Sequence, residues 1–498
     1  PPHIIHDQLL ILIMLQLILV VLIAFVAYVA FKHIASQPGQ VPKGTFNDKL
    51  NDKTKRSFYD VAIVGAGPSG STCGYYMSKA GAHVLLLDKA PAFPRDKYCG
   101  DAVCKTAIEI LADMGLYPKL VQDNKAHVAD SGGFVSPAGL SYVGRSKDVY
   151  ANETSLVPAA IAIKRLDLDE AIAMTAKAAG ADLKCGSTVD KATFDKDKGL
   201  WTVSTAEGAS YQARTLVCAD GAQSGLARKL GIVVGEPQGS CSRAFVEGGT
   251  HKFDADGVVF YNKAILPGYA AIFRHPNDVL NYCCYLIPGN PEVVNEDLKK
   301  WHDYLLNEDE MLKAALGTEY KIEPMRAGVL RLGGVPISYG EHVLVTGDAA
   351  GMIDPMTGEG IHHAMEGGKI AAQTLIDCIK QGNYSAEAMK VYHQRWMYAF
   401  GSDFTWSDNI CQFLYRFPIF LDAAALAVQR KGNEFLARWA DIMTGRVPKI
   451  HLLRPEFVMV ISFCFFQLCV ERYILGKKPK KVATYNEQPA QKVRKGGK

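Results

Sequence analysis

The globular part of the chain begins with an apolar run and a glycine-rich turn, Tyr59-Asp60-Val61-Ala62-Ile63-Val64-Gly65-Ala66-Gly67-Pro68-Ser69-Gly70. The apolar run is typical of a parallel strand that is buried on both faces. Gly65 permits a tight turn, Gly67 lets the backbone approach a diphosphate, and Gly70 allows the next helix to pack closely on the strand. A second apolar run, His83–Leu87, ends at Asp88, whose carboxylate can accept hydrogen bonds from a ribose. This order of strand, turn, helix and strand predicts a Rossmann-like α/β unit that binds a dinucleotide.

A segment without charged residues lies near the N-terminus. Leu9–Phe31 is 23 residues long, and a helix of that length spans a hydrocarbon core of about 30 Å. We therefore predict an N-terminal transmembrane anchor at residues 1–33 and a polar linker at residues 34–57. Lys and Arg are sparse before this segment and frequent after it, so the globular part should face the cytosol. The endoplasmic reticulum fits this arrangement best, with a mitochondrial or plastid membrane as the alternative.

The C-terminal region combines aromatic residues with a basic tail. Phe457–Val470 is apolar but, at 14 residues, is short for a membrane span, so we expect it to lie on the bilayer or in the core. Residues 391–475 are predicted to be helical and membrane-associated, because their aromatic side chains suit a membrane interface. Residues 476–498 form a basic tail that either contacts anionic lipid headgroups or is simply solvated.

Charge and cysteine content exclude several classes of protein. The chain has 55 Lys and Arg against 51 Asp and Glu, so no nucleic-acid partner is predicted. Its 12 cysteines form no CxxC pair, and no zinc, iron–sulfur or other metal site is predicted. Scattered cysteines of this kind suit a reducing compartment.

Three later segments resemble the motifs of a known family. Pro94–Gly100, PRDKYCG, resembles the PRxKxCG signature of the geranylgeranyl reductase family, flavoenzymes that saturate isoprenoid double bonds. Val217–Ala222 resembles the DG motif, and Val343–Gly351 with Pro355–Ile361 the second FAD motif, of the para-hydroxybenzoate hydroxylase-like flavoprotein superfamily. The resemblance covers roughly residues 58–455. It implies one bound FAD, because no second glycine motif follows a strand, and NAD(P)H or a protein electron donor as a transient reductant.

The resemblance also implies roles for the matched residues. Ser69 would lie against the pyrophosphate, and the backbone of Val189 would meet the adenine. Arg165, in a stretch similar to the family's ERxxFD, would contact the cofactor. Asp348 would lie at the ribityl chain. The complete predicted cofactor-binding set is Gly65, Gly67, Pro68, Ser69, Gly70, Asp88, Lys89, Arg95, Cys99, Gly100, Ala102, Arg165, Val189, Asp220, Gly221, Asp348, Gly358, Gly360 and Ile361.

Two positions near the expected flavin ring leave alternatives open. Gly358 and Gly360 open a helix whose N-terminus could stabilise anionic reduced flavin, or they are an ordinary helix start after Pro355. Cys99 is either a small residue that lines the flavin or a redox thiol. No His, Glu or Tyr is singled out by its spacing, so the catalytic residues stay unknown.

The substrate-facing motif of the family is altered in this chain. The family carries GYxWxFP on the sheet that covers the substrate cavity, and the matching stretch here is Gly268-Tyr269-Ala270-Ala271-Ile272-Phe273-Arg274. Ala271 replaces the expected Trp and Arg274 replaces the expected Pro, so we expect a wider or differently shaped cavity. Tyr269, Ala271 and Phe273 are the predicted substrate residues, although aromatic strand residues are also common in plain cores.

The predicted architecture is an α/β fold in which an antiparallel substrate sheet is inserted into a Rossmann-like FAD-binding domain. The FAD-binding domain comprises residues 58–235 and 330–390, and the substrate sheet residues 236–329. The predicted function is FAD-dependent reduction of double bonds in an isoprenoid or other lipid at a membrane. The alternatives are a lipid monooxygenase similar to squalene monooxygenase and a non-catalytic flavoprotein-fold subunit of a membrane complex.

Overall fold

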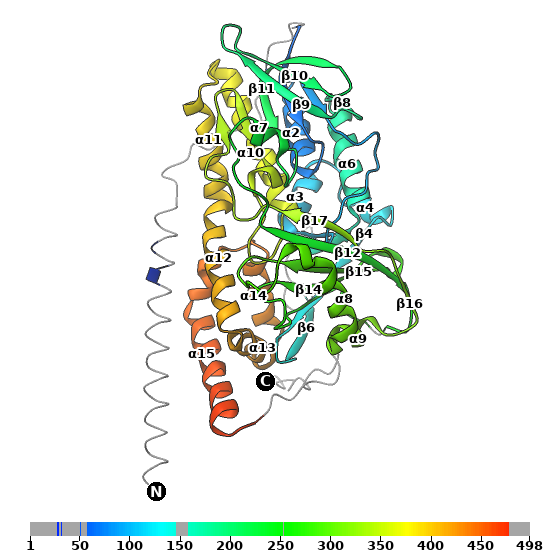
Figure 1. The fold of residues 1–498 in the computed structure, drawn as a ribbon, viewed down its shortest axis with the longest axis vertical. Coiled ribbons are helices and arrows are strands. Elements are labelled where there is room, and N and C mark those ends of the chain that lie inside the picture. The colour runs from blue at the N-terminus through cyan, green and yellow to red at the C-terminus, as the bar shows by residue number, and fades with distance from the viewer. Residues whose placement is uncertain are drawn as a thin grey trace, which may run out of the picture.

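The computed structural model describes residues 27, 28, 31, 50, 57–145, 158–251 and 253–477. The predicted N-terminal anchor and linker lie almost entirely outside these residues, and so does the basic tail from residue 478. Figure 1 shows an elongated body, with the nucleotide-binding sheet at one end and a second sheet and the C-terminal helices at the other.

The first sheet is built around the strand that the sequence analysis started from. Its strands are β1 (Tyr59–Val64), β2 (Val84–Leu87), β8 (Asp182–Lys184), β9 (Val189–Asp195), β10 (Leu200–Thr205), β11 (Ser210–Cys218), β18 (Tyr339–Gly340) and β19 (Val343–Val345). They run in the order β18-β19-β11-β1-β2-β8, and β10 pairs with both β11 and β9. The central pairs are parallel, with Val61 opposite both Thr215 and Val84. Three of the last four residues of β1 are fully buried, as expected for a strand covered on both faces.

Helices cover this sheet. They are α2 (Pro68–Lys79), α3 (Lys105–Asp113), α4 (Lys119–Gln122), α6 (Arg165–Ala178), α7 (Gly225–Lys229), α10 (Ile361–Gln381) and α11 (Ala386–Trp396). The helix α2 packs against both α10 and α6. A Cβ atom at Gly368 of α10 would lie 2.2 Å from the carbonyl oxygen of Ser69, so glycine is needed where the two helices approach so closely. A small antiparallel sheet of β3 (Ala102–Cys104), β7 (Ala160–Ile163) and β4 (Ala126–Ala129) packs beside them.

The second sheet contains more of the chain than the sequence analysis assigned to it. Its strands are β5 (Ser131–Val135), β6 (Ser141–Arg145), β12 (Gly239–Gly248), β13 (Gly257–Phe260), β14 (Tyr269–Arg274), β15 (Leu280–Leu286), β16 (Tyr320–Ile322) and β17 (Arg326–Leu330). Of these, β5 and β6 come from the segment assigned to the FAD-binding domain. The predicted antiparallel sheet is also mixed, because β13 pairs with β5 in parallel. Tight hairpins enforce antiparallel pairing only between strands that are consecutive in the chain, and β5 reaches this sheet from far upstream.

Short helices complete the second half of the body. The helices α8 (Leu298–Glu308) and α9 (Glu310–Leu316) pack on the second sheet, and the 3₁₀ turns are η1 (Pro276–Asp278), η2 (Asn295–Asp297), η3 (Gly347–Ala350) and η5 (Lys449–Leu453). The C-terminal helices are α12 (Ser402–Arg416), which follows the π-helical turn η4 (Met397–Gly401), then α13 (Ile419–Lys431), α14 (Asn433–Met443) and α15 (Pro455–Cys469), which continues through η6 (Val470–Ile474). In Figure 1, α12 runs along one side of the body between its two halves.

The last helix is longer than the sequence analysis predicted. The helix from Pro455 to Ile474 has 20 residues and a mean hydropathy of 1.7, so among the described residues it has the length and composition to cross a membrane. The predicted segment of 14 residues counted only the apolar stretch from Phe457 to Val470, which Ser462 and Gln467 interrupt. The helix starts earlier because proline fits its first turn, and it continues past Glu471. One face packs on α13, where Phe465 stacks on Phe420 with ring centroids 4.5 Å apart.

Candidate functional site: a dinucleotide groove and an adjoining apolar cavity

The glycine turn after β1 forms one wall of a groove at the carboxyl ends of the parallel strands. Gly65 has a φ of +104°, and a Cβ atom there would lie 2.2 Å from the carbonyl oxygen of Ala219. A Cβ atom at Gly70 would lie 1.9 Å from the carbonyl oxygen of Gly65. The first turn of α2 follows Gly67 and has no side-chain cap. Its backbone N–H groups are therefore available to a diphosphate.

Asp88 and an arginine pair shape the next wall. Asp88 Oδ2 accepts a hydrogen bond of 2.8 Å from the backbone N–H of Ala66, which fixes the glycine turn to the end of β2. Arg95 and Arg165 meet at one carboxylate, because Asp169 lies 3.1 Å from Arg95 Nη2 and accepts 2.7 Å and 3.0 Å bonds from Arg165. Asp169 is fully buried. It therefore holds two cations at the groove while its own charge is balanced.

The opposite wall comes from chain segments far from the glycine turn. Ser69 Oγ lies 2.8 Å from Thr346 Oγ1, which joins the start of α2 to the end of β19. Asp220 Oδ2 accepts a 2.7 Å hydrogen bond from the N–H of Leu226, whereas its Oδ1 is buried without a partner. Gly358, with a φ of +65°, packs where a Cβ atom would lie 2.9 Å from the ring of Tyr285. These contacts bring the distant motifs together around one groove.

The groove has a volume of about 380 Å³. The predicted cofactor residues that line it are Gly65, Gly67, Pro68, Ser69, Asp88, Lys89, Arg95, Cys99, Arg165, Val189, Asp220, Gly221, Asp348, Gly358, Gly360 and Ile361. Gly70 supports the groove from behind by its packing on Gly65, and Gly100 and Ala102 line the adjoining cavity instead. Thr346 and Tyr285 also line the groove, and the sequence motifs did not single them out.

The residues present fit FAD. The glycine turn has no room for a Cβ atom at Gly65 or Gly70. The N-terminus of α2, which has no side-chain cap, offers N–H donors to a diphosphate. Asp88 follows β2 at the place where a ribose would lie. The groove also extends to the N-terminus of α10, because Gly360, its N-cap, and Ile361, its first residue, line the groove. This long helix can stabilise negative charge on a bound ring system at its N-terminus.

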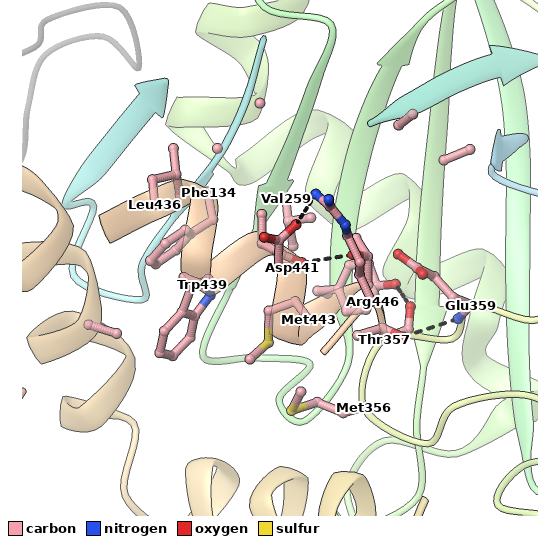
Figure 2. A pocket seen from close by; sticks show the side chains of 18 of the residues that line it. Phe134, Val259, Met356, Thr357, Glu359, Leu436, Trp439, Asp441, Met443 and Arg446 are labelled. Carbon is pink, nitrogen blue, oxygen red and sulfur yellow. Dashed lines mark hydrogen bonds and ion pairs between the residues drawn. The ribbon is translucent and has the colours of Figure 1, made fainter. Parts of the chain in front are cut away.

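An apolar cavity of about 700 Å³ adjoins the groove. Five residues line both spaces: Cys99, Tyr285, Gly358, Gly360 and Ile361. The far wall is formed by the C-terminal helices, and Figure 2 shows Leu436, Trp439 and Met443 around the space together with Phe134 of β5. The polar side chains labelled there are Thr357, Glu359 and an ion pair of 3.1 Å between Arg446 and Asp441. A ligand in the cavity would therefore contact mostly hydrocarbon surface and would reach the groove at one end.

The three predicted substrate residues do not share one environment. Tyr269 and Phe273 line the cavity. Ala271 is fully buried and does not line it, because its side chain packs in a cluster with Cys241 and Ile353. The rings of Tyr269 and Tyr285 stack with centroids 4.9 Å apart, and the Tyr269 hydroxyl donates to the carbonyl of Thr357.

A buried ion pair holds the loop between the groove and the cavity. Lys449 Nζ lies 2.6 Å from Asp354 Oδ2, and the two side chains are 1% and 2% exposed. Ser407 of α12 also donates to Asp354, over 2.7 Å. The other oxygen of Asp354 accepts a bond of 2.8 Å from the N–H of Met356. The C-terminal helices are thereby tied to the loop that carries Gly358, a link that no sequence motif predicted.

Two carboxyl groups that line the cavity, half-buried Glu359 and buried Asp101, have raised pKa values. Burial, together with nearby Asp354, raises the pKa of Glu359 to about 8 although Lys449 opposes the shift. Burial likewise raises the pKa of Asp101 to about 8, against the lowering effect of Arg243. Burial also raises the pKa of the Cys99 thiol, which keeps it protonated and favours its interpretation as a lining residue over a redox thiol. Glu359 was quoted within a motif, but nothing in its spacing distinguished it.

Taken together, the fold and the groove define an FAD-dependent oxidoreductase. Residues 58–262 match the family model described as FAD binding domain. The chain is 30% identical, over 70% of its length and 83% of the relative, to digeranylgeranylglycerophospholipid reductase of Methanocaldococcus jannaschii. It is also 30% identical, over 64% of its length and 76% of the relative, to menaquinone reductase of Mycobacterium tuberculosis. The chain therefore belongs to the geranylgeranyl reductase family of FAD-dependent oxidoreductases.

The chain is also similar to one further relative in sequence and to one solved structure in fold. The chain is 48% identical, over 88% of its length and 85% of the relative, to "Conditioned medium factor receptor 1" of Dictyostelium discoideum. A geranylgeranyl bacteriochlorophyll reductase-like protein of Thermoplasma acidophilum has a similar fold. The TM-score is 0.59 at 20% identity, and the match covers 84% of this chain and 99% of that one.

Proposed function

We propose that this protein reduces carbon–carbon double bonds of an isoprenoid lipid at a membrane. The observation that carries the proposal is the apolar cavity of about 700 Å³, which shares Cys99, Tyr285, Gly358, Gly360 and Ile361 with the FAD groove. A prenyl chain offers hydrocarbon surface and almost no hydrogen-bonding groups, so a cavity of this size and lining suits it.

One group of residues binds the cofactor, and another orients the substrate. When FAD is bound and has been reduced by NAD(P)H or by a protein electron donor, it would supply the hydride. The glycine turn, Asp88 and the Arg95–Arg165 pair hold the cofactor. Asp348 lines the same groove, and Gly358 and Gly360 line it where it meets the cavity. Tyr269 and Phe273 orient the prenyl chain, while the walls of the cavity exclude water from the reacting double bond.

Membrane attachment explains how such a substrate arrives. Several large apolar side chains on α15 and η6 are exposed: Val458, Met459, Phe463, Phe466, Val470, Tyr473 and Ile474. Val458 also lines the cavity, together with Ile461 and Ser462 of the same helix. A helix that has one apolar face in the bilayer and forms part of the cavity wall gives a lipid a short path to the cofactor. The charge-free segment at residues 9–31 would add a second, N-terminal anchor that spans the membrane and leaves the globular part on the cytosolic side.

The test is anaerobic reduction by the purified holoenzyme in detergent. Dithionite-reduced protein is mixed with geranylgeranyl diphosphate in micelles, and the products are analysed by mass spectrometry. We expect the flavin to reoxidise and the lipid to gain two hydrogen atoms for each double bond reduced. Reoxidation that requires oxygen, with oxygenated lipid as the product, would instead support a lipid monooxygenase.

A second candidate function is a receptor or a non-catalytic subunit of a membrane complex. The 48% identical relative whose name is that of a receptor favours it. Protein that is colourless when purified in mild detergent, and remains so after FAD is added, would support this role. Bound FAD with turnover would leave reduction as the function.

A further inference from the structure

Glu359 occupies the point where the FAD groove meets the apolar cavity. Its two neighbours, Gly358 and Gly360, line the groove, and Glu359 itself lines the cavity. Its backbone is fixed on both sides, since its N–H contacts Thr357 Oγ1 at 3.4 Å and its carbonyl accepts a 3.0 Å bond from the N–H of Asp354. The carboxyl group is therefore held within one residue of the groove wall.

The carboxyl group itself is not committed to a structural bond. Its Oε2 is buried and has no hydrogen-bond partner, while the side chain as a whole is 29% exposed, towards the cavity that it lines. Among the other acids that line the cavity, Asp441 pairs with Arg446 at 3.1 Å. Asp101 accepts a 2.9 Å bond from Asn281 through Oδ2 and also leaves its Oδ1 without a partner, but its side chain is only 2% exposed. Glu359 thus combines access to the cavity with an oxygen that is free to donate a proton.

The surroundings of Glu359 favour its protonated form. Asp354 lies nearby. One polar side-chain atom of Cys104, one of His362 and one oxygen of Glu359 all lie within 4.8 Å of one another. Lys449 opposes the effect of Asp354, and because these two charges pair with each other, burial is the main cause that favours the protonated form. His362 Nδ1 is 3.7 Å from Glu359 Oε2, and burial keeps the pKa of His362 well below its usual value, so this imidazole is neutral. A protonated acid in an apolar pocket is suited to general acid catalysis near neutral pH.

We infer that Glu359 is the catalytic acid, and that it donates the proton which completes the reduction of the double bond. This inference rests on the proposed reductase function. The π bond of the alkene breaks, one carbon receives the hydride from reduced FAD, and the other receives the proton from Glu359. The carboxylate left behind takes a proton from solvent through the cavity that Glu359 lines.

The test compares E359Q and E359D with the wild type and with E366Q. Glu366 lies on α10, which begins two residues after Glu359, and burial raises its pKa to about 7, but it lines neither the groove nor the cavity. Reoxidation of pre-reduced holoenzyme by geranylgeranyl diphosphate is followed anaerobically at 450 nm from pH 6 to pH 10. We expect E359Q to lose about 100-fold or more in rate with unchanged FAD content, E359D to recover part of the loss, and E366Q to match the wild type.

Three readouts distinguish this inference from its alternatives. The wild-type rate should fall as the pH rises through about 8, and E359Q should lack this dependence. Infrared spectra at pH 7 should contain a protonated carboxyl band that E359Q lacks, which tests Glu359 even if the substrate is of another class.

Wild-type rate in E359Q, or the absence of that band from the wild type, would overturn the inference. Loss of wild-type activity on EDTA treatment would also overturn it, by assigning Cys104, Glu359 and His362 to a metal. Failure of the wild type itself to reduce the lipid would count against the proposed function alone.

Discussion

The buried pair between Lys449 and Asp354 makes a quantitative prediction about how the C-terminal helices support the flavin site. In K449M the carboxylate of Asp354 stays buried but loses its cation, at a position where both side chains are at most 2% exposed. Breaking a buried ion pair by removing one partner costs about 3–5 kcal/mol. Asp354 keeps its hydrogen bonds from Ser407 and from the N–H of Met356, so we expect the lower end of that range, about 3 kcal/mol.

The effect should depend on pH in a defined direction. Burial alone would raise the pKa of Asp354, but Lys449 and the hydrogen bonds lower it overall. Its contribution to stability is therefore present above the unfolded pKa of about 4 and is lost as the pH falls through the folded value. The pKa of Lys449 is raised because its two carboxylate partners, Asp354 at 2.6 Å and Asp403 at 3.4 Å, outweigh burial. Its contribution to stability is therefore lost above about pH 10. The difference between K449M and the wild type should be largest between these limits.

Urea unfolding in detergent at pH 7 and pH 3, with a parallel titration of FAD binding at pH 7, measures both consequences. The control is K300M, because Lys300 is 62% exposed and pairs with Asp297 at 3.2 Å, and a surface pair is worth about 0–1 kcal/mol. Weaker FAD binding is expected in K449M only, since the pair fixes the loop that carries Gly358. A K449M protein as stable as K300M, with unchanged FAD affinity, would refute the reasoning.

Two substitutions in the groove give further expectations. G65A should abolish FAD binding, because its Cβ atom would lie 2.2 Å from the carbonyl oxygen of Ala219. The control is G208A, at a position with a φ of +90° and open space around it, which should lose only about 1 kcal/mol of stability. Equal FAD content in the two purified variants would contradict this expectation. C99A should retain FAD and most of its turnover, since burial keeps the thiol protonated. Separate measurements of flavin retention and turnover decide the point, and loss of turnover with full retention would restore a redox role for Cys99.

The sequence by itself determined the nucleotide-binding core. The run from Tyr59 to Gly70 predicts a strand, a turn and a helix because each step depends on neighbouring residues: apolar side chains for the buried strand, and glycines where a Cβ atom would collide with the backbone. The position of Asp88 follows from the same local unit. The motif around Pro94–Gly100 added the family, and with it FAD.

Only the tertiary structure decided how distant segments meet. No periodicity in the sequence relates Asp169 to its two arginine partners, or Lys449 to Asp354. None predicts that Glu359 lies between the groove and the cavity. The addition of β5 and β6 to the second sheet, and of the C-terminal helices to the cavity wall, is of the same kind. Burial and pairing over long sequence separations depend on how complete elements pack, whereas a turn or a strand depends mainly on the residues within it.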